Sequence, residues 1–407
     1  MTGFNPSSTT TTLAARSVGH AVRSTAALAV SFFVFAFPSY AQAMTTSEKR
    51  TTTATAKVAH STSPGRPAAG DDVVRPFRVQ FPQAALDDLR QRIAATRFPE
   101  RETVNDRTQG VQLETIEAVA RYWATEYDWR RCEAQLNALP NFITEIDGLD
   151  IHFIHVRSKH PNALPIIVTH GWPGSPIEQL KIIGPLTDPT AFGGKAEDAF
   201  DVVIPSMPGY GFSGRPTTTG WDPEHIARAW VVLMKRLGYS RFVAQGGDWG
   251  AIVTDYMGQQ AAPELLAIHT NMAGVVPPDI DKALFTGGPV PSGLPDDERR
   301  ACEALSFVYK KGIGYAFQMG LRPQTLYGIA DSPVGLAAYM LDHDAASYAH
   351  ISELFVDGRP YGDLTRDDIL DNVTLAWLTN TGSPPAVSTG RTRARSSASR
   401  ASPSRSP

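Results

Sequence analysis

The segment 246–250, which reads Gly-Gly-Asp-Trp-Gly, restricts the possible folds more than any other part of this sequence. It directly follows a short apolar run and precedes a helical pattern, and its small residues permit a sharp turn around Asp248. A strand, a sharp turn and a helix form a nucleophile elbow, which lifts the central side chain above the end of a sheet. Glycine-rich turns also bind phosphates, but the Asp248 carboxylate would repel one. The sequence therefore predicts a carboxylate nucleophile on an α/β fold.

Short apolar runs alternate with helical patterns along the middle of the chain, which indicates a doubly wound, mostly parallel sheet. The six expected strands are Phe142–Ile146, Leu149–Val156, Pro165–Thr169, Asp201–Pro205, Arg241–Gln245 and Leu265–Asn271. The first two should form a hairpin around Asp147-Gly148. Helices are expected at 177–183 and 225–237, and two more, around 86–93 and 116–127, precede the sheet and should pack against it.

A second loop lies where an oxyanion hole is expected. Residues 170–174, reading His-Gly-Trp-Pro-Gly, follow the third predicted strand. Hydrolases with such an elbow place there a loop whose backbone N–H stabilises an oxyanion. The two donors would be the N–H groups of Trp172 and Trp249. A further loop at 206–213 follows the next strand and belongs to the same rim of the sheet.

In these features the sequence resembles the epoxide hydrolases of the α/β-hydrolase superfamily, specifically the microsomal-type branch with an N-terminal segment ahead of the catalytic domain. The resemblance runs from about Arg75 to about Gly382. It rests on Arg75-Pro-Phe, Thr169-His-Gly-Trp-Pro-Gly-Ser, Pro205-Ser-Met-Pro-Gly-Tyr-Gly-Phe-Ser, Gln245-Gly-Gly-Asp-Trp-Gly, and Gly314-Tyr-Ala-Phe-Gln followed by Asp331-Ser-Pro-Val-Gly-Leu-Ala-Ala-Tyr. It implies an α/β-hydrolase fold with a helical cap and no need for a metal or a cofactor.

The residues suit the implied reaction. A carboxylate that opens an epoxide forms an ester, which water can cleave at its carbonyl, whereas a serine would leave an ether. The resemblance makes Asp248 the nucleophile and Tyr315, as a cap tyrosine, the proton donor to the opening ring; Tyr315 as a merely buried aromatic residue is the alternative. The Trp172 and Trp249 amides would hold the oxyanion of ester hydrolysis. A small or aromatic epoxide and water are the expected reactants.

The end of the sequence departs from that family. Hydrolases with this elbow follow the order nucleophile, acid, histidine, but the last histidine here is His350 and the last acidic residue is Asp371. His343 and His350 lie in what resembles the cap, and the earlier His152, His155 and His170 lie in the hairpin and the oxyanion loop. We therefore expect no histidine and no acid positioned for ester hydrolysis, and impaired turnover.

The residues from 383 onward suggest the reason. They include eight Ser, five Arg and four Pro, with no His, acidic or aromatic residue, so they cannot form a buried strand. A frameshift would explain the abrupt change. A basic tail that binds nucleic acid or an anionic membrane is disfavoured, because five charges stand without interleaved aromatics. The strand 265–271 would then be an exposed edge, and aggregation is expected.

Composition and pattern divide the chain into segments. They are an export signal at 1–43, a disordered linker at 44–74, the N-terminal segment at 75–141, the α/β-hydrolase core at 142–276, the helical cap at 277–382 and an Arg/Ser-rich tail at 383–407. The signal combines early arginines, a short apolar run and an Ala-x-Ala end, which predicts export. If Met44 is the true start, the protein is cytoplasmic. No membrane span is expected after cleavage, and the net charge of −3 gives no sign of nucleic-acid binding.

Two other functions stay open at this point. A haloalkane dehalogenase also carries Asp-Trp after the elbow strand, and its indole N–H can hold a departing halide; the N-terminal segment and Tyr315 favour the epoxide. A non-catalytic protein that keeps the pocket and binds a ligand without turnover is the third hypothesis. Oligomeric state cannot be predicted from the sequence.

Overall fold

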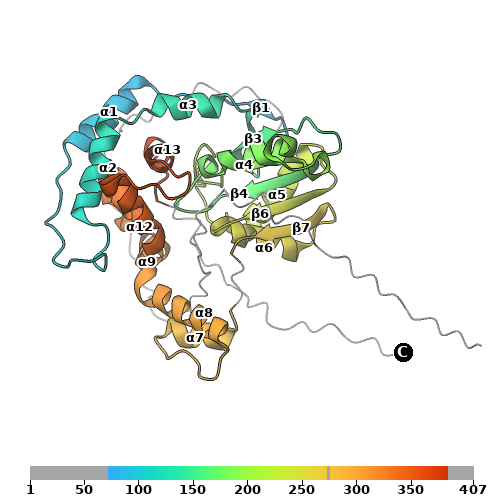
Figure 1. Ribbon diagram of the computed structural model, residues 1–407. Coiled ribbons are helices and arrows are strands. Elements are labelled where there is room, and N and C mark those ends of the chain that lie inside the picture. Colours follow the sequence, from blue (N-terminus) through green and yellow to red (C-terminus); the bar gives the residue numbers. More distant parts are fainter. Residues whose placement is uncertain (1–71, 273–275, 384–407) are drawn as a thin grey trace, which may run out of the picture.

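The computed structural model describes residues 72–272 and 276–383 (Figure 1). The predicted export signal at 1–43, the predicted linker up to residue 71 and the predicted tail from residue 384 lie outside these residues. None of the helices in the described ranges is long and apolar enough to cross a membrane.

A seven-stranded sheet in the order β1-β2-β3-β5-β4-β6-β7 forms the centre of the molecule. The strands are β1 (Arg75–Pro76), β2 (Asn141–Ile146), β3 (Leu149–Val156), β4 (Leu164–Thr169), β5 (Phe200–Pro205), β6 (Phe242–Gly246) and β7 (Leu265–Thr270). All six predicted strands are confirmed to within one residue at either end. Strand β1 was not predicted, because two residues are too few to show alternation.

The sheet is mixed. The pairs β4–β5, β4–β6 and β6–β7 are parallel, whereas β1–β2, β2–β3 and β3–β5 are antiparallel. The β2–β3 hairpin turns at Asp147 and Gly148, whose φ angles of 51° and 78° are both positive, as a two-residue type I′ turn requires. Central strands are apolar on both faces: Ile167 and Val168 of β4, whose side chains point to opposite faces, have no exposed surface. The parallel half of the sheet brings the predicted catalytic loops to one edge.

Three helices of the core flank these strands: α4 (Leu180–Thr187), α5 (Pro223–Arg236) and α6 (Trp249–Gln260). Helix α5 begins where the Asp222 carboxylate accepts the N–H of His225, which satisfies a donor that the helix leaves unpaired. Its fully buried Trp230 and Leu233 lie one turn apart on the face toward the core. The predicted helix at 177–183 is a short 3₁₀ turn (Pro176–Gln179) that leads into α4.

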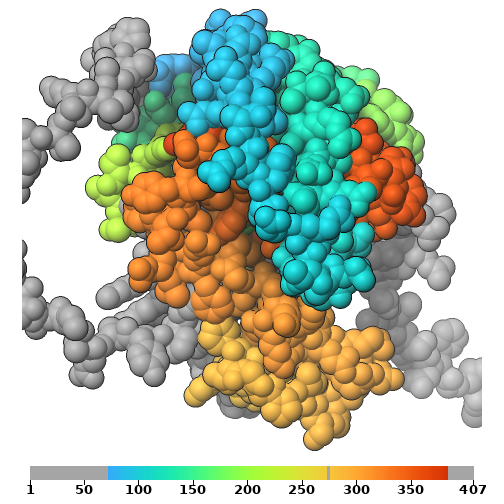
Figure 2. Space-filling model, turned by 90° about the vertical axis from the view of Figure 1, so that its left-hand side faces the viewer, coloured from blue at the N-terminus to red at the C-terminus, as the bar shows by residue number. Residues whose placement is uncertain are grey.

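The N-terminal segment contains α1 (Gln83–Ala94), α2 (Leu113–Thr125) and α3 (Trp129–Asn137). The prediction that the first two pack against the sheet is wrong: they contact each other and α11 (Pro333–Leu341), and the Trp123 indole donates to Thr374 Oγ1 on α13 (Arg366–Leu378) at 2.9 Å. The apolar face of α2 meets an equally apolar surface on these later helices. Figure 2 shows the two segments side by side on one face of the molecule.

Every regular element in the described part of 277–382 is helical. Besides α11 and α13, this part contains α7 (Pro278–Phe285), α8 (Asp296–Phe307), α9 (Gly314–Leu321), α10 (Tyr327–Asp331) and α12 (Ala345–Ser352). Helices α7 and α8 extend away from the sheet (Figure 1). They have a small apolar core of their own around Leu284 and Leu305, separate from the main one.

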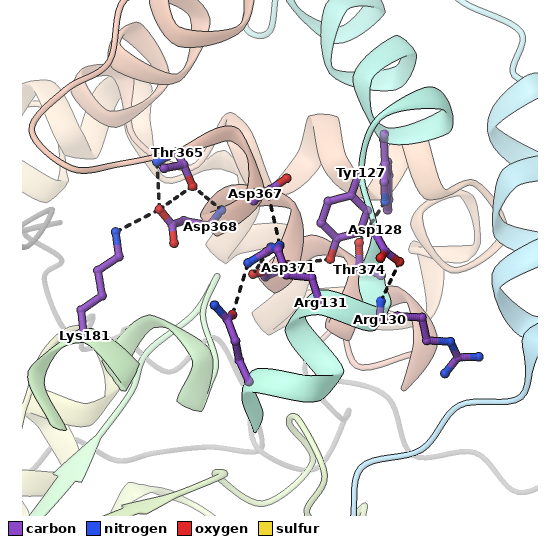
Figure 3. A network of polar contacts seen from close by, with 12 residues as sticks. Tyr127, Asp128, Arg130, Arg131, Lys181, Thr365, Asp367, Asp368, Asp371 and Thr374 are labelled. Atoms are coloured by element: carbon purple, nitrogen blue, oxygen red, sulfur yellow. Dashed lines mark hydrogen bonds and ion pairs between the residues drawn. The ribbon is translucent and has the colours of Figure 1, made fainter. Parts of the chain in front are cut away.

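Helix α13 is fixed by ionic contacts on two sides (Figure 3). Arg131 of α3 donates from one nitrogen to both oxygens of Asp371 at 2.8 Å, and the Tyr127 hydroxyl donates to Asp371 at 2.7 Å. On the other side Lys181 of α4 contacts Asp368 at 3.0 Å. Asp371 is only 3% exposed. The helix therefore connects the N-terminal segment to the core.

Strand β7 is an edge strand of the sheet among the described residues. Leu266 and Ile268 are 44% and 40% exposed, and a groove lined mainly by β7 and the end of α6 runs along this edge. An open edge of this kind can pair with other chains.

Candidate active site

Asp248 lies between the end of β6 and the start of α6, at the predicted elbow. Its backbone has φ 52° and ψ −128°, a conformation that costs free energy for any residue except glycine. The flanking glycines make the turn possible. A Cβ at Gly246 would lie 2.0 Å from the carbonyl oxygen of Gly250, and one at Gly250 would lie 2.1 Å from the carbonyl oxygen of Thr169.

Both predicted oxyanion donors reach the Asp248 carboxylate. The N–H of Trp172 donates to Oδ1 at 2.7 Å, and the N–H of Trp249 also bonds to this carboxylate. Enclosure by protein raises the pKa of Asp248 to about 6, although these two N–H groups favour the ionised form. Gly171 allows the approach, since a Cβ there would lie 2.4 Å from Oδ1. Asp248 is therefore mostly ionised at neutral pH and is held by two backbone donors.

Tyr315 at the start of α9 lies beside these groups. Its ring stacks on that of Trp172, with the centroids 5.1 Å apart, and it packs near Ala251 at the start of α6. Burial, and then the negative charge of Asp248, raise the pKa of Tyr315 above its ordinary value. The phenol therefore keeps its proton and can donate it. Tyr339, which the sequence did not single out, donates from its hydroxyl to the Tyr315 carbonyl at 3.2 Å.

Two of the five histidines considered have both ring nitrogens bonded to partners away from Asp248. Nε2 of His170 accepts the N–H of Met207 at 3.0 Å, so its proton is on Nδ1, which donates to the Gly171 carbonyl. His152 contacts Ser206 and Asn141. Burial lowers the pKa of both rings. Neither is a base for water near neutral pH.

His343 lies closer to the site than the sequence indicated. Its ring is 4.7 Å from that of Tyr315 and 5.4 Å from that of Trp172, because the chain that follows α11 folds over the oxyanion loop. Burial lowers its pKa to about 3, so the ring is neutral and weakly basic. The other histidines singled out lie elsewhere: His350 stacks on Tyr361, and His155 contacts Tyr239.

Sequence reasoning missed Glu178. Its Oε1 accepts the N–H of Gly171 at 3.3 Å, which places a second carboxyl group beside the oxyanion loop. A Cβ at Gly174 would lie 2.1 Å from Glu178 Oε2, so the loop's last glycine makes room for it. The only signal in the sequence is its position one turn after the His-Gly-Trp-Pro-Gly loop.

The oxyanion loop is also held by α13 and by Gly382, which follows that helix. The Ser175 hydroxyl donates to Asn372 Oδ1 at 2.6 Å, and the Trp172 indole donates to the Gly382 carbonyl at 3.3 Å. Asp371, the last acidic residue of the sequence, is used in the ion pair with Arg131 rather than at the nucleophile. Among the described residues no group of three or more His, Cys, Asp or Glu side chains is arranged to hold a metal ion.

Together these groups can perform one type of chemistry. A carboxylate on a half-buried turn can attack an electrophilic carbon, a protonated phenol can supply a proton to the oxygen that leaves that carbon, and two N–H groups can hold a developing oxyanion. The first step, attack on the electrophilic carbon, requires no residue of the site other than the carboxylate.

Comparison with known proteins identifies relatives. The family model described as the epoxide hydrolase N terminus matches residues 74–179, and the model for the alpha/beta hydrolase fold matches residues 165–306. A protein of Stigmatella aurantiaca that is named as an epoxide hydrolase is 48% identical over 314 residues, covering 77% of this chain and 68% of the relative. Epoxide hydrolase 1 of Oryctolagus cuniculus is 34% identical over 322 residues, covering 76% and 70%.

A solved structure of an epoxide hydrolase is also similar to this chain. The juvenile hormone epoxide hydrolase from the silkworm Bombyx mori superposes with a TM-score of 0.68 at 30% sequence identity, covering 79% of this chain and 78% of that one.

Proposed function

The chain belongs to the epoxide hydrolase family of the α/β-hydrolase fold, and we propose that it opens an epoxide by attack of the Asp248 carboxylate. The observation that carries this proposal is the approach of the Trp172 N–H to Asp248 at 2.7 Å. This contact places the nucleophilic carboxylate beside an oxyanion donor. An ester between Asp248 and the substrate would be the first product.

Tyr315 is the proposed proton donor to the ring oxygen. Its position against Trp172 and its raised pKa support this role, since a phenol that keeps its proton can protonate the alkoxide as it forms. A dehalogenase would need no such acid, because halide leaves without a proton. The relatives, all named epoxide hydrolases, favour the epoxide as well.

Replacing Tyr315 by phenylalanine should slow ester formation by about 10²-fold or more, because general acid assistance is lost. The rate of adduct formation with styrene oxide, followed by intact-protein mass spectrometry, measures this. Tyr327→Phe is the matched control, because that side chain is 74% exposed and should leave the rate unaltered. Equal rates for Tyr315→Phe and the unsubstituted chain would contradict the role.

Hydrolysis of the ester is proposed to be slow in this chain. His152 and His170 are committed to other partners, and burial makes His343 a weak base. General base help is worth about 10²–10⁴-fold, so without a suitable histidine among the described residues the site should accumulate the ester.

The half-reactions can be separated by stoichiometry. Incubation of the purified 407-residue chain with excess styrene oxide should label about one site per molecule, with diol appearing much more slowly than adduct. A rapid mixing series that follows both species tests this. Sustained production of many diol molecules per protein at the rate of adduct formation would contradict slow hydrolysis. Ligand-dependent stabilisation without any adduct would favour the non-catalytic alternative instead.

A further inference from the structure

Two carboxyl groups occupy consecutive backbone N–H groups of the oxyanion loop. Glu178 Oε1 accepts the N–H of Gly171 at 3.3 Å, and Asp248 Oδ1 accepts the N–H of Trp172 at 2.7 Å. The negative charge of Asp248 also acts on Glu178, so the two acids are neighbours. Two positions without a Cβ, Gly171 and Gly174, make this approach possible. The proposed ring-opening mechanism uses only one of the two acids.

Neighbouring acids do not ionise independently. The surrounding protein, and in addition the negative charge of Asp248, hold the pKa of Glu178 above its ordinary value. Glu178 is exposed, so solvent screens part of this effect, but the direction is clear: Asp248 loses its proton first. The free protein therefore holds a nucleophilic carboxylate at Asp248 and keeps the remaining proton on Glu178.

Formation of the ester changes this balance. An alkylated Asp248 carries no charge, so the repulsion that favours protonated Glu178 disappears, and the pKa of Glu178 falls. The effect of the surrounding protein, the larger cause of the raised pKa, remains, but without the Asp248 charge Glu178 loses its proton more readily beside the ester. Ring opening takes the proton from Tyr315, which then regains one from solvent. Glu178 releases one proton to solvent, so the protons balance.

We propose that Glu178 is the base for the residual hydrolysis of the Asp248 ester, switched on by the loss of charge when Asp248 is alkylated. This proposal rests on the proposed ester. A water oxygen bonds to Cγ of Asp248 while Glu178 takes one of its protons, and the Trp172 and Trp249 amides hold the resulting oxyanion. The bond from Cγ to the alkyl oxygen then breaks. The diol oxygen takes the proton from Glu178, and the proton on the regenerated Asp248 carboxyl passes to Glu178.

In the described part of the chain three other titratable groups lie near this pair. His170 lies behind Gly171 with both nitrogens bonded, Tyr315 holds its proton, and His343 packs on Tyr315. His343 is the remaining candidate base, although burial lowers its pKa to about 3. The variant His343→Gln is therefore the matched comparison for Glu178→Gln, since each replaces one candidate base by an uncharged side chain.

The experiment measures decay of the ester separately from its formation. Each protein is labelled to completion with styrene oxide, freed of excess reagent, and followed by mass spectrometry between pH 4 and pH 9. In the unsubstituted chain the decay rate should rise with pH and level off once Glu178 is ionised. Glu178→Gln should slow decay at the plateau by about 10²-fold and remove the pH dependence, whereas His343→Gln should keep it. Decay in H₂¹⁸O should place ¹⁸O on Asp248.

Each other result would overturn the proposal. Equal decay in Glu178→Gln and the unsubstituted chain removes the role of Glu178. If ester decay loses its pH dependence in His343→Gln, whether or not it also does so in Glu178→Gln, the pH dependence does not report Glu178 alone. An adduct that forms with His343→Gln but not with Glu178→Gln would show that Glu178 acts in ring opening. Failure of the unsubstituted chain to form any adduct would instead contradict the proposed function, so the two failures are distinguishable.

Discussion

Replacing Asp248 by alanine is expected to abolish covalent capture of an epoxide by this chain. The side chain is the carboxylate presented by the elbow, and the two N–H groups that reach it cannot themselves attack carbon. Loss of a nucleophile costs at least about 10⁴-fold, which puts adduct formation below detection. Asp248→Asn should be nearly as inactive, because an amide is a poor nucleophile. Intact mass and peptide mapping after exposure to styrene oxide measure the result.

The control for this substitution is Asp255→Ala, which removes an exposed carboxylate on the same helix that accepts a hydrogen bond from Gln259. It should leave the adduct in place. In the unsubstituted chain, capture should also weaken as the pH falls through about 6, because the pKa of Asp248 is raised to about 6 and the protonated acid is not a nucleophile. If the Asp248→Ala protein still forms the adduct in full yield, Asp248 is not the nucleophile.

Replacing Arg131 by methionine should destabilise the fold by about 3–5 kcal/mol, because it leaves the buried Asp371 carboxylate without its cation. Asp371 is 3% exposed, and burial already raises its pKa despite the bonds from Tyr127 and Arg131. Chemical denaturation followed by circular dichroism gives the change in the free energy of unfolding. If loss of the ion pair causes the destabilisation, adding Asp371→Leu to the Arg131→Met protein should restore much of the lost free energy of unfolding.

The matched control lies one residue earlier. Arg130 pairs with Glu133 within α3, and without Arg130 the Glu133 carboxylate still accepts the N–H of Phe81 and the Trp129 indole, so Arg130→Met should cost less than Arg131→Met, about 1 kcal/mol. A similar loss for the two arginines would show that helix propensity in α3, and not the contact with α13, is responsible.

The sequence predicted the parts of this molecule that depend on neighbouring residues or on strand ends. The elbow at Asp248 and the Trp172 loop each carry a local motif, and the parallel order of β4 and β6 brings them together although they are 76 residues apart. The placement of the N-terminal segment was not predictable in this way. An amphipathic α2 shows that it has an apolar face, but periodicity does not say whether a sheet or α11 covers it.

The acids illustrate the same limit. Glu178 stands in a stretch whose pattern predicts only a helix, and its bond to Gly171 depends on how a 3₁₀ turn packs beneath the loop. His343 was predicted to lie in a helical stretch that resembles the cap and not to fit the catalytic site, because nothing in the sequence shows that the residues after α11 return to Trp172. Contacts of this kind come from tertiary packing, which local spacing does not encode.

The backbone of Asp248 has a consequence for how such a protein can change over evolutionary time. At φ 52° and ψ −128° a side chain costs on the order of 1–3 kcal/mol, and glycine is the residue that avoids this cost. Random drift under selection for folding alone would thus favour glycine at the very position that carries the nucleophile. The aspartate at this position therefore lowers the stability of the fold that presents it.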